Sequence, residues 1–332
     1  MFVYTIKRIL WVVPVIFGVL LLVFFFQSIT GDDIAYRLLG DGSTPEAREA
    51  LRERMGLNDP MLVQFGRYMW GFVSRGDLGT SYATKQPITT ELMLRFPVTL
   101  RLTFLSIIVG VCVGVPLGII AAVKQYSLVD SAILTFAVLT TSMPGFWLGL
   151  MMISLFAVNL GWLPSSGVMS WKGWIMPIAA CAIGTMSSII RVTRSSMLEV
   201  IRQDYIRTAR AKGQRLTVIT IRHAFRNSLI PIIAAVGNSL GLQLGGALAI
   251  ESVFSVPGIG KYAVDAISFR NFPAVSGSVV LLAIVFIIVN LVIDLMYTVA
   301  DPRLKVAFAS AGTSKRRRKK IPEVAEGGMG NG

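Results

Sequence analysis

Long apolar runs alternate with shorter polar segments along this chain of 332 residues. A helix needs about 20 apolar residues to cross about 30 Å of hydrocarbon, because each residue adds about 1.5 Å. Six runs reach that length, at residues 9–29, 98–122, 131–158, 174–192, 228–250 and 275–299. No small-residue cleavage pattern follows the first run, which favours a retained helix over a signal peptide. The pattern predicts an all-α polytopic membrane protein with six transmembrane helices.

The longest polar segment, residues 31–96, mixes acidic and basic side chains and has no run long enough to span a membrane. Ser43 and Glu46 have the spacing of a capping box, which predicts a helix that continues to about Met55 and ends at Gly56. Apolar residues at helical spacing predict a second helix over 60–72. We expect both helices to lie on the outer membrane surface.

Basic residues indicate the orientation, because Lys and Arg collect on the cytoplasmic side of membrane proteins. Lys7 and Arg8 precede the first span, basic residues fill the loop between the fourth and fifth spans, and the run 315–320 follows the last. Both termini are therefore expected in the cytoplasm (N-in/C-in), with the tail on anionic membrane lipid. The expected parts are an N-terminal transmembrane helix (1–30), an extracytoplasmic subdomain (31–96), a five-helix core (97–300) with a cytoplasmic loop at about 194–226, and a basic, largely disordered tail (301–332).

Composition supports the membrane class, since 54% of the residues are hydrophobic and only 15% are charged. The net charge of +14 raises the alternative of nucleic-acid binding. However, the basic residues stand in blocks between apolar runs rather than along a face that also carries aromatic residues. We therefore expect no nucleic-acid partner.

Glycine recurs at every fourth position in two of the expected spans, which places three glycines on one face of each helix. Such a face lets a neighbouring backbone approach closely. We expect these residues to serve helix packing within the bundle, and a subunit interface or a pathway wall stays open as the alternative. They are Gly110, Gly114 and Gly118 in the second span, and Gly237, Gly241 and Gly245 in the fifth.

The chain lacks the residues of an energy-converting or catalytic site. Formal charges are nearly absent from the expected spans, Asp294 being an exception, whereas an ion-coupled carrier would often place ionisable groups near the midplane. The nearest string to a phosphate-binding loop, 255–262, lacks its first glycine and its magnesium-binding hydroxyl. His223 is the only histidine, and two cysteines lie in separate apolar runs. We expect no catalytic residue, no metal site and no cofactor bound by this chain; a secondary carrier, a scaffold or an enzyme is the less favoured alternative.

The loop between the fourth and fifth spans predicts an amphipathic helical hairpin. Apolar residues recur at helical spacing from Met197 to Ile206, and Lys212 with Gly213 marks the end of the helix. A second short helix is expected over about 216–225. Small residues near the end of the first helix would admit a partner closely.

The strings DYIRTARAKG (204–213) and RHAFRNSLIP (222–231) resemble the coupling-loop motif of binding-protein-dependent ABC importer permeases. The match is to the B-type subunit of the dipeptide, oligopeptide and nickel branch. The glutamate of the wider superfamily motif is missing here, as in the peptide branch. Further motifs of this branch are GDLG (76–79), PLG (116–118), GWLP (161–164), ESVF (251–254), PGIG (257–260) and DPR (301–303).

The resemblance implies a type I ABC importer permease fold in the bacterial inner (cytoplasmic) membrane. It implies a second, C-type permease subunit, two ABC ATPase subunits that hold ATP and Mg, and an extracytoplasmic substrate-binding protein. Peptides (dipeptide or oligopeptide) are the expected substrates, with glutathione and nickel or other metal chelates as alternatives. The residues expected to couple to the ATPase are Glu199, Asp204, Tyr205, Arg207, Thr208, Ala209, Ala211, Lys212 and Gly213. The outer gate is expected at Glu251, Pro257, Gly258 and Gly260.

Overall fold

The computed structural model describes residues 14–26, 29, 34–40 and 42–300. Within these ranges every regular element is a helix, apart from a single antiparallel bridge between Thr80 and Pro87. The all-α prediction is therefore confirmed. The expectations for Lys7, Arg8 and the tail 301–332 fall outside the described residues.

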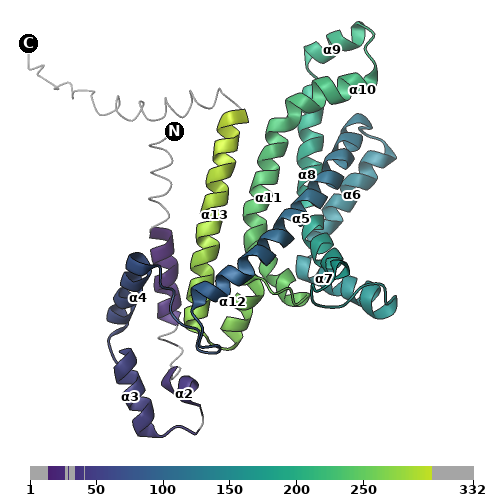
Figure 1. Ribbon diagram of the computed structural model, residues 1–332. Coiled ribbons are helices and arrows are strands. Elements are labelled where there is room, and N and C mark those ends of the chain that lie inside the picture. Colours follow the sequence, from purple (N-terminus) through teal and green to yellow (C-terminus); the bar gives the residue numbers. More distant parts are fainter. Residues whose placement is uncertain (1–13, 27–28, 30–33, 41, 301–332) are drawn as a thin grey trace, which may run out of the picture.

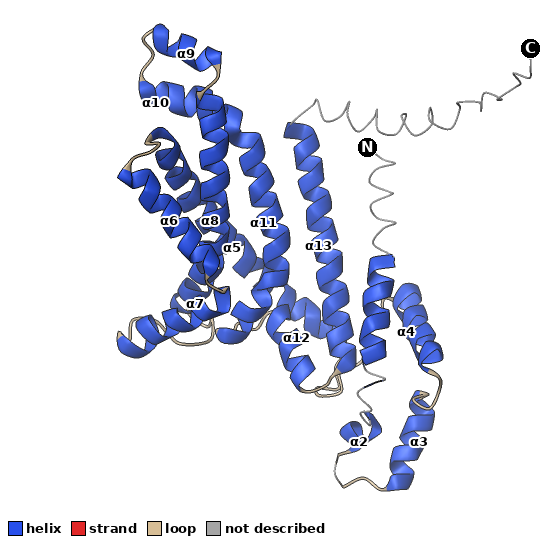
Figure 2. Ribbon diagram, turned by 180° about the vertical axis from the view of Figure 1, so that it is seen from behind, coloured by secondary structure: helices blue, strands red, loops and turns tan. Residues whose placement is uncertain are grey.

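Among the described residues, four helices are long and apolar enough to cross a membrane. Figures 1 and 2 show the bundle in the order N-terminal helix, α13, α11, α8 and α6, with α5 running obliquely across it. The described part of the N-terminal helix, Pro14–Phe26, is apolar but shorter than a full span. The four long helices are α5 (Ile88–Val123), α8 (Trp171–Ile201), α11 (Arg226–Val253) and α13 (Phe272–Ala300).

The span expected at 131–158 is not one continuous helix. In its place α6 (Leu128–Ser142) is followed by α7 (Gly145–Met152) and the π-helical segment η1 (Ile153–Asn159), with a bend of 100° between the two parts. Pro144 explains the break, because its ring disfavours the helical conformation at Met143, which is extended. The described chain thus has four candidate spans, or five if the bent pair is one span.

Two helices extend beyond the limits expected from their apolar runs. The helix expected from residue 98 begins at Ile88, so the expected boundary at 96–97 lies inside α5. The helix expected to end at 192 continues to Ile201. In both extensions the polar residues are compatible with helix, so the helices continue past the apolar stretch.

The segment before α5 carries α2 (Ile34–Leu39), α3 (Pro45–Met55) and α4 (Met61–Arg75). The predicted end of α3 is confirmed, since Gly56 has φ +64° and donates its N–H to the last carbonyls. The predicted capping box is wrong by one residue: the Thr44 hydroxyl accepts the N–H of Ala47 at 3.3 Å. Pro45 accounts for the shift, because proline is favoured at the first helical position.

Apolar clusters lie at opposite ends of the bundle. The first joins the N-terminal helix, α4, α5, α13 and the short helix α12 (Ile259–Ser268), and we call this the α12 end. The second joins α5, α8, the helix α9 (Asp204–Ala211) and the π-helical segment η2 (Ile219–Phe225), which follows the short helix α10 (Leu216–Val218), and we call this the α9 end. The first cluster consists of Ile16, Leu20, Phe65, Leu78, Ile88, Leu92, Ile259, Ala266, Ala274 and Val280. The second consists of Ala122, Met197, Ile206, Ala209, Ile219 and Ala224.

Candidate functional site

At the α9 end, a helical hairpin projects beyond the long helices (Figure 1). The expected continuous run from Met197 to Gly213 is broken, because α8 ends at Ile201 and α9 begins at Asp204. Gly213 follows α9 with φ +73°, a conformation that side chains other than glycine rarely adopt. The expected second helix is not separate, since α10 leads through the π-helical segment η2 (Ile219–Phe225) into α11.

One face of α9 packs against its own chain. Ile206 is fully buried and Ala209 is nearly so, both against the cluster at the α9 end. The amide of Asn227 donates to the Tyr205 hydroxyl at 3.1 Å. These contacts fix α9 relative to α11. Ala209 was expected to face a partner, but it packs inward.

The opposite face of α9 is exposed. Tyr205, expected on the apolar face, is 45% exposed. Arg207 lies 3.5 Å from Asp204, an exposed ion pair that stabilises the helix little. The exposed members of the expected coupling set are Glu199, Asp204, Tyr205, Arg207, Thr208, Ala211, Lys212 and Gly213. The structure thus gathers most of the set on one accessible surface, with Glu199 near the end of α8.

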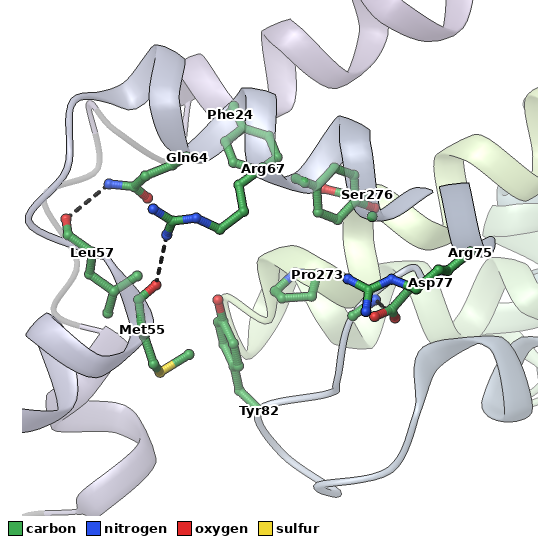
Figure 3. A pocket seen from close by; sticks show the side chains of 13 residues that line it. Phe24, Met55, Leu57, Gln64, Arg67, Arg75, Asp77, Tyr82, Pro273 and Ser276 are labelled. Carbon is green, nitrogen blue, oxygen red and sulfur yellow. Dashed lines mark hydrogen bonds between the residues drawn. The ribbon is translucent and has the colours of Figure 1, made fainter. Parts of the chain in front are cut away.

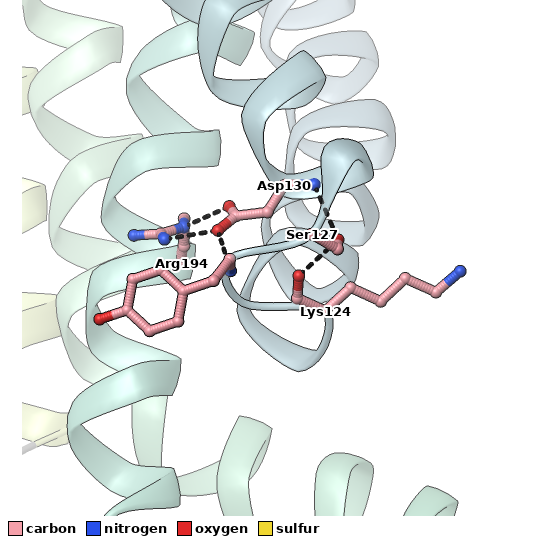
Figure 4. Close-up of polar contacts among 5 residues, drawn as sticks. Lys124, Ser127, Asp130 and Arg194 are labelled. Carbon is pink, nitrogen blue, oxygen red and sulfur yellow. Dashed lines mark hydrogen bonds and ion pairs between the residues drawn. The ribbon is translucent and has the colours of Figure 1, made fainter.

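A largely buried ion pair joins the turn between α5 and α6 to α8 (Figure 4). The guanidinium of Arg194 on α8 binds the Asp130 carboxylate through two hydrogen bonds of 2.6 and 2.7 Å. The same carboxylate accepts the N–H of Tyr126 at 3.0 Å. The pair therefore fixes the turn between α5 and α6 to α8. Both residues fall just outside the spans expected from sequence; the helix-start signal formed by Ser127 and Asp130 could have pointed to this position.

At the α12 end, the carboxylate of Glu251 joins three helices. Glu251 is fully buried near the end of α11. Its Oε1 accepts the Thr99 hydroxyl of α5 at 2.7 Å. Its Oε2 accepts the N–H groups of Gly260 and Lys261 at 2.7 and 3.1 Å. These N–H groups lie in the first turn of α12, where a helix favours negative charge.

Two glycines make room for this carboxylate. A Cβ on Gly258 would overlap the Glu251 carboxylate, and a Cβ on Gly260 would lie 2.6 Å from the backbone of Leu248. The structure therefore brings Glu251, Gly258 and Gly260 of the expected gate into direct contact. Pro257 is exposed beside them.

A second polar cluster ties α12 to the start of α5. The Tyr262 hydroxyl donates to the Glu91 carboxylate, and the guanidinium of Arg95 lies 4.4 Å from the centre of the Tyr262 ring. Burial, together with the adjacent Glu91 carboxylate, raises the pKa of Tyr262. The phenol therefore remains a donor. Residue types alone gave no signal for this contact between positions far apart in the sequence.

A pocket of about 290 Å³ opens at the α12 end, between the segment before α5 and the start of α13 (Figure 3). Gln64 and Arg67 on α4 donate to the carbonyls of Leu57 and Met55, which shapes one wall. Burial raises the pKa of Tyr82, on the opposite wall, to about 12. The pocket is lined by Phe24, Met55, Leu57, Gln64, Arg67, Tyr68, Gly71, Arg75, Asp77, Gly79, Tyr82, Pro273 and Ser276.

The glycines of α5 face α8. A Cβ on Gly110 would lie 3.1 Å from Thr185, one on Gly114 3.0 Å from the carbonyl of Met186, and one on Gly118 2.6 Å from Thr193. These short distances mean that α5 and α8 approach as only glycine allows.

The glycines of α11 differ among themselves. A Cβ on Gly237 would lie 2.7 Å from Ile293 of α13, and one on Gly241 3.3 Å from Phe286. Gly245 has no such neighbour within 4 Å among the described residues. Only the first two therefore lie against α13. Within the described ranges, no group of three or more His, Cys, Asp or Glu residues could hold a metal ion.

Comparisons with known proteins identify the family of this chain. Residues 114–306 match the family model of the binding-protein-dependent transport system inner membrane component, and residues 1–103 match that of its N-terminal part. A putative peptide transport system permease protein of Brucella abortus is 37% identical over 307 residues, covering 90% of this chain and 98% of that protein.

Two further relatives are similar over most of their length. The dipeptide transport system permease protein DppB of Alkalihalophilus pseudofirmus is 38% identical, covering 92% of this chain and 100% of that protein. The glutathione transport system permease protein GsiC of Salmonella paratyphi A is 37% identical, covering 91% and 98%.

A solved structure shares the fold. A chain of the MetNI methionine ABC transporter in an inward-facing conformation superposes with a TM-score of 0.56 at 20% identity, covering 64% of this chain and 96% of that chain. Membership of the family implies ATPase and binding-protein partners, with ATP bound and hydrolysed by the partner ATPase. The chain belongs to the binding-protein-dependent transport family, as a multi-pass permease subunit of an inner-membrane ABC importer.

Proposed function

We propose that this chain, together with a second, C-type permease subunit, forms the pathway by which peptides cross the inner membrane. The observation that carries the proposal is full-length similarity to permeases named for peptide and dipeptide transport. Glutathione is the second candidate, because a glutathione permease is similar to the same extent. Both candidates are short chains with amide bonds.

We propose six spans with both termini in the cytoplasm. The count takes the N-terminal helix as one span and the bent pair α6–α7 as another, beside the four long helices. The α9 end would then lie inside, because it carries the dense basic residues of the hairpin, such as Arg207, Arg210 and Lys212. The α12 end and the segment 31–96 would face the binding protein outside.

We propose that the exposed face of α9 binds an ATPase subunit. Side chains such as Arg207 and Thr208 on this face are exposed. On the other face Ile206 is buried, and the hydrogen bond from Asn227 of α11 to Tyr205 fixes α9 further. A movement of the ATPase would therefore be passed through α9 to α8 and α11. At the other end, Glu251 would hold α11, α12 and α5 together as the outer gate.

Reconstitution tests the substrate and the dependence on partners. The tagged chain is purified with its associated subunits, placed in proteoliposomes with the binding protein, and supplied with labelled dialanine, tetraalanine or glutathione. We expect ATP-dependent uptake of at least one peptide and none from the isolated chain. Uptake by the isolated chain without ATP would contradict the proposal.

Cysteine labelling tests the sidedness. In a variant without Cys112 and Cys181, Thr208→Cys on α9 and Met169→Cys in the loop before α8 provide exposed thiols at opposite ends. A membrane-impermeant maleimide added to intact spheroplasts should label residue 169 and reach residue 208 only after lysis. The reverse pattern would reject the orientation.

Matched glycine variants test the docking surface. Gly213 and Gly40 both have positive φ and, among the described residues, no neighbour within 4 Å of an added Cβ, so an aspartate strains the two backbones alike. We expect Gly213→Asp to reduce uptake more than about 10-fold, equivalent to about 1.4 kcal/mol of coupling, while membrane levels stay normal. Gly40→Asp should leave uptake nearly unchanged. Preserved uptake in Gly213→Asp would remove the coupling assignment.

A further inference from the structure

A second pocket, of about 280 Å³, opens between the middle of α8 and the middle of α11. Its residues recur at steps of three or four on each helix, so each helix contributes one face. None of these side chains carries a formal charge. The pocket is lined by Gly145, Ala180, Cys181, Gly184, Thr185, Ser188, Asn238, Ser239, Leu242, Gln243 and Ile250.

One donor in the pocket wall lacks a regular partner. Gln243 is only 9% exposed, and its Oε1 accepts the Thr185 hydroxyl at 3.1 Å. Its Nε2 has no hydrogen bond among the described residues. The Cys181 thiol lies beside this amide but is a weak acceptor. A buried amide left in this state costs stability unless another molecule supplies an acceptor.

The mouth of the pocket is exposed in the middle of the apolar bundle. Asn238 and Leu242 are exposed there. Gly184, which also lines the pocket, has no described residue within 4 Å of an added Cβ. Polar side chains within membrane spans face a water-filled cavity or another protein chain rather than lipid. The Asn238 face of α11 is therefore a path or an interface.

We infer that this pocket is a contact site for the transported peptide, where Gln243 donates to a backbone carbonyl. The inference rests on the proposed function. A peptide offers a neutral carbonyl acceptor at every residue, which matches a neutral donor in an uncharged wall. Such a wall forms no ion pair with either terminus or with charged side chains, so the contact is independent of peptide sequence. It is also weak enough for release, as a pathway requires.

A matched pair of variants on α11 tests the donor. Gln243→Leu removes the amide and retains much of the volume. Ser228→Ala is the control, because Ser228 does not line the pocket and its hydroxyl already donates to the Ala224 carbonyl. We expect Gln243→Leu to reduce dialanine uptake about five-fold, the effect of about one hydrogen bond, while ATP hydrolysis stimulated by the binding protein stays within two-fold. Ser228→Ala should match the unmodified transporter.

The outcomes separate this inference from the proposed function. If the unmodified transporter takes up no peptide, the proposed function fails. If it does, and Gln243→Leu transports like Ser228→Ala, the pocket assignment is overturned and the function stands.

Cysteine accessibility provides a test that does not depend on the Gln243 variant folding. In the assembled transporter without Cys112 and Cys181, Asn238→Cys is treated with a charged methanethiosulfonate. Ile288→Cys, on an exposed apolar part of α13, is the control. We expect residue 238 to react, residue 288 to resist, and saturating dialanine with its binding protein to slow the reaction at 238. No reaction at 238 in any nucleotide state, or a reaction that peptide does not slow, would overturn the assignment.

Discussion

The two ends of the bundle are held together by different means. At the α12 end, buried polar groups from α5, α11 and α12 satisfy one another, as in the hydrogen bonds of Glu251 to Thr99 and Gly260. At the α9 end, an apolar patch holds one face of α9 and the polar face stays exposed. At the α12 end the buried polar groups therefore find their partners within the chain, whereas the α9 end leaves a polar surface exposed that another subunit can bind.

The Asp130–Arg194 pair marks the limit of the exposed region. It lies on the α9 side of the bundle, yet the Asp130 side chain is only 4% exposed. The pair therefore fixes the turn between α5 and α6 to α8, whereas the polar side chains of α9 are exposed. Variants at the two ends should thus differ in how strongly they affect the stability of the isolated chain.

The largest effect is expected from Glu251→Ala. It removes the acceptor for the Thr99 hydroxyl and for two backbone N–H groups in a buried site, each worth about 1–3 kcal/mol. We expect a loss of more than about 3 kcal/mol in unfolding free energy, seen as a lower thermal midpoint in detergent and a reduced membrane level. Glu251→Gln retains one acceptor oxygen and should be intermediate. A normal midpoint for Glu251→Ala would contradict the view of this end as self-contained.

A smaller loss is expected from breaking the ion pair with Asp130→Asn. Removing one partner of a fully buried pair costs about 3–5 kcal/mol. Because the Arg194 side chain is 20% exposed, we expect Asp130→Asn to lower the unfolding free energy by about 2 kcal/mol. The double variant Asp130→Leu/Arg194→Met should recover most of that loss in the same thermal assay. Equal losses in single and double variants would show that the charge pairing itself is unimportant.

The contact between α5 and α8 should tolerate an added methyl group less well than the face of α11 that carries Gly245. Gly118→Ala would place a methyl 2.6 Å from Thr193 and 2.9 Å from the Ile190 carbonyl, so the helices must separate. We expect Gly118→Ala to lower the unfolding free energy by about 1–2 kcal/mol. Gly245→Ala meets no neighbour within 4 Å in the described part of the chain and should leave the thermal midpoint unchanged or slightly higher. Similar losses in both variants would point to backbone flexibility rather than packing.

The smallest effect is expected from Tyr205→Phe on α9, which removes one exposed hydrogen bond worth about 0.5 kcal/mol. The same chemical change at the other end, Tyr262→Phe, leaves the Glu91 carboxylate without its donor and should cost about 1.5–3 kcal/mol. The two thermal midpoints compare the ends directly. If the two variants lose equal stability, the contrast between the ends does not hold.

The existence of the long helices could be predicted from sequence, because apolar length is a local property. Their limits could not: α5 begins ten residues early and continues through Pro97 at the edge of its apolar run. The helix α8 ends nine residues late, because no glycine or proline follows its apolar run up to Ile201. Pro144 signalled an interruption. The 100° bend depends on what α7 packs against, and the sequence pattern does not contain that information.

The segments that form the site could be predicted from sequence, but the contacts between distant segments could not. The motif around Glu251, Gly258 and Gly260 falls within ten residues, so their proximity could be expected. Thr99 lies 152 positions from Glu251, and residue types alone do not pair them. The burial of Ala209 had a usable signal, because it stands three residues after the apolar Ile206 and therefore shares its face.

The length of α5 has a consequence for the surrounding lipid. A helix of 36 residues measures about 54 Å, whereas the hydrocarbon layer is about 30 Å thick. A free helix would adjust its tilt to the bilayer. Here Thr99, near one end of α5, is hydrogen-bonded to Glu251. At the other end, Arg194 fixes the turn after α5 to α8. Between the two ends, the glycines of α5 pack closely against α8. The tilt is therefore set by protein contacts, and a mismatch in bilayer thickness is accommodated by thinning or thickening of the lipid around the helix.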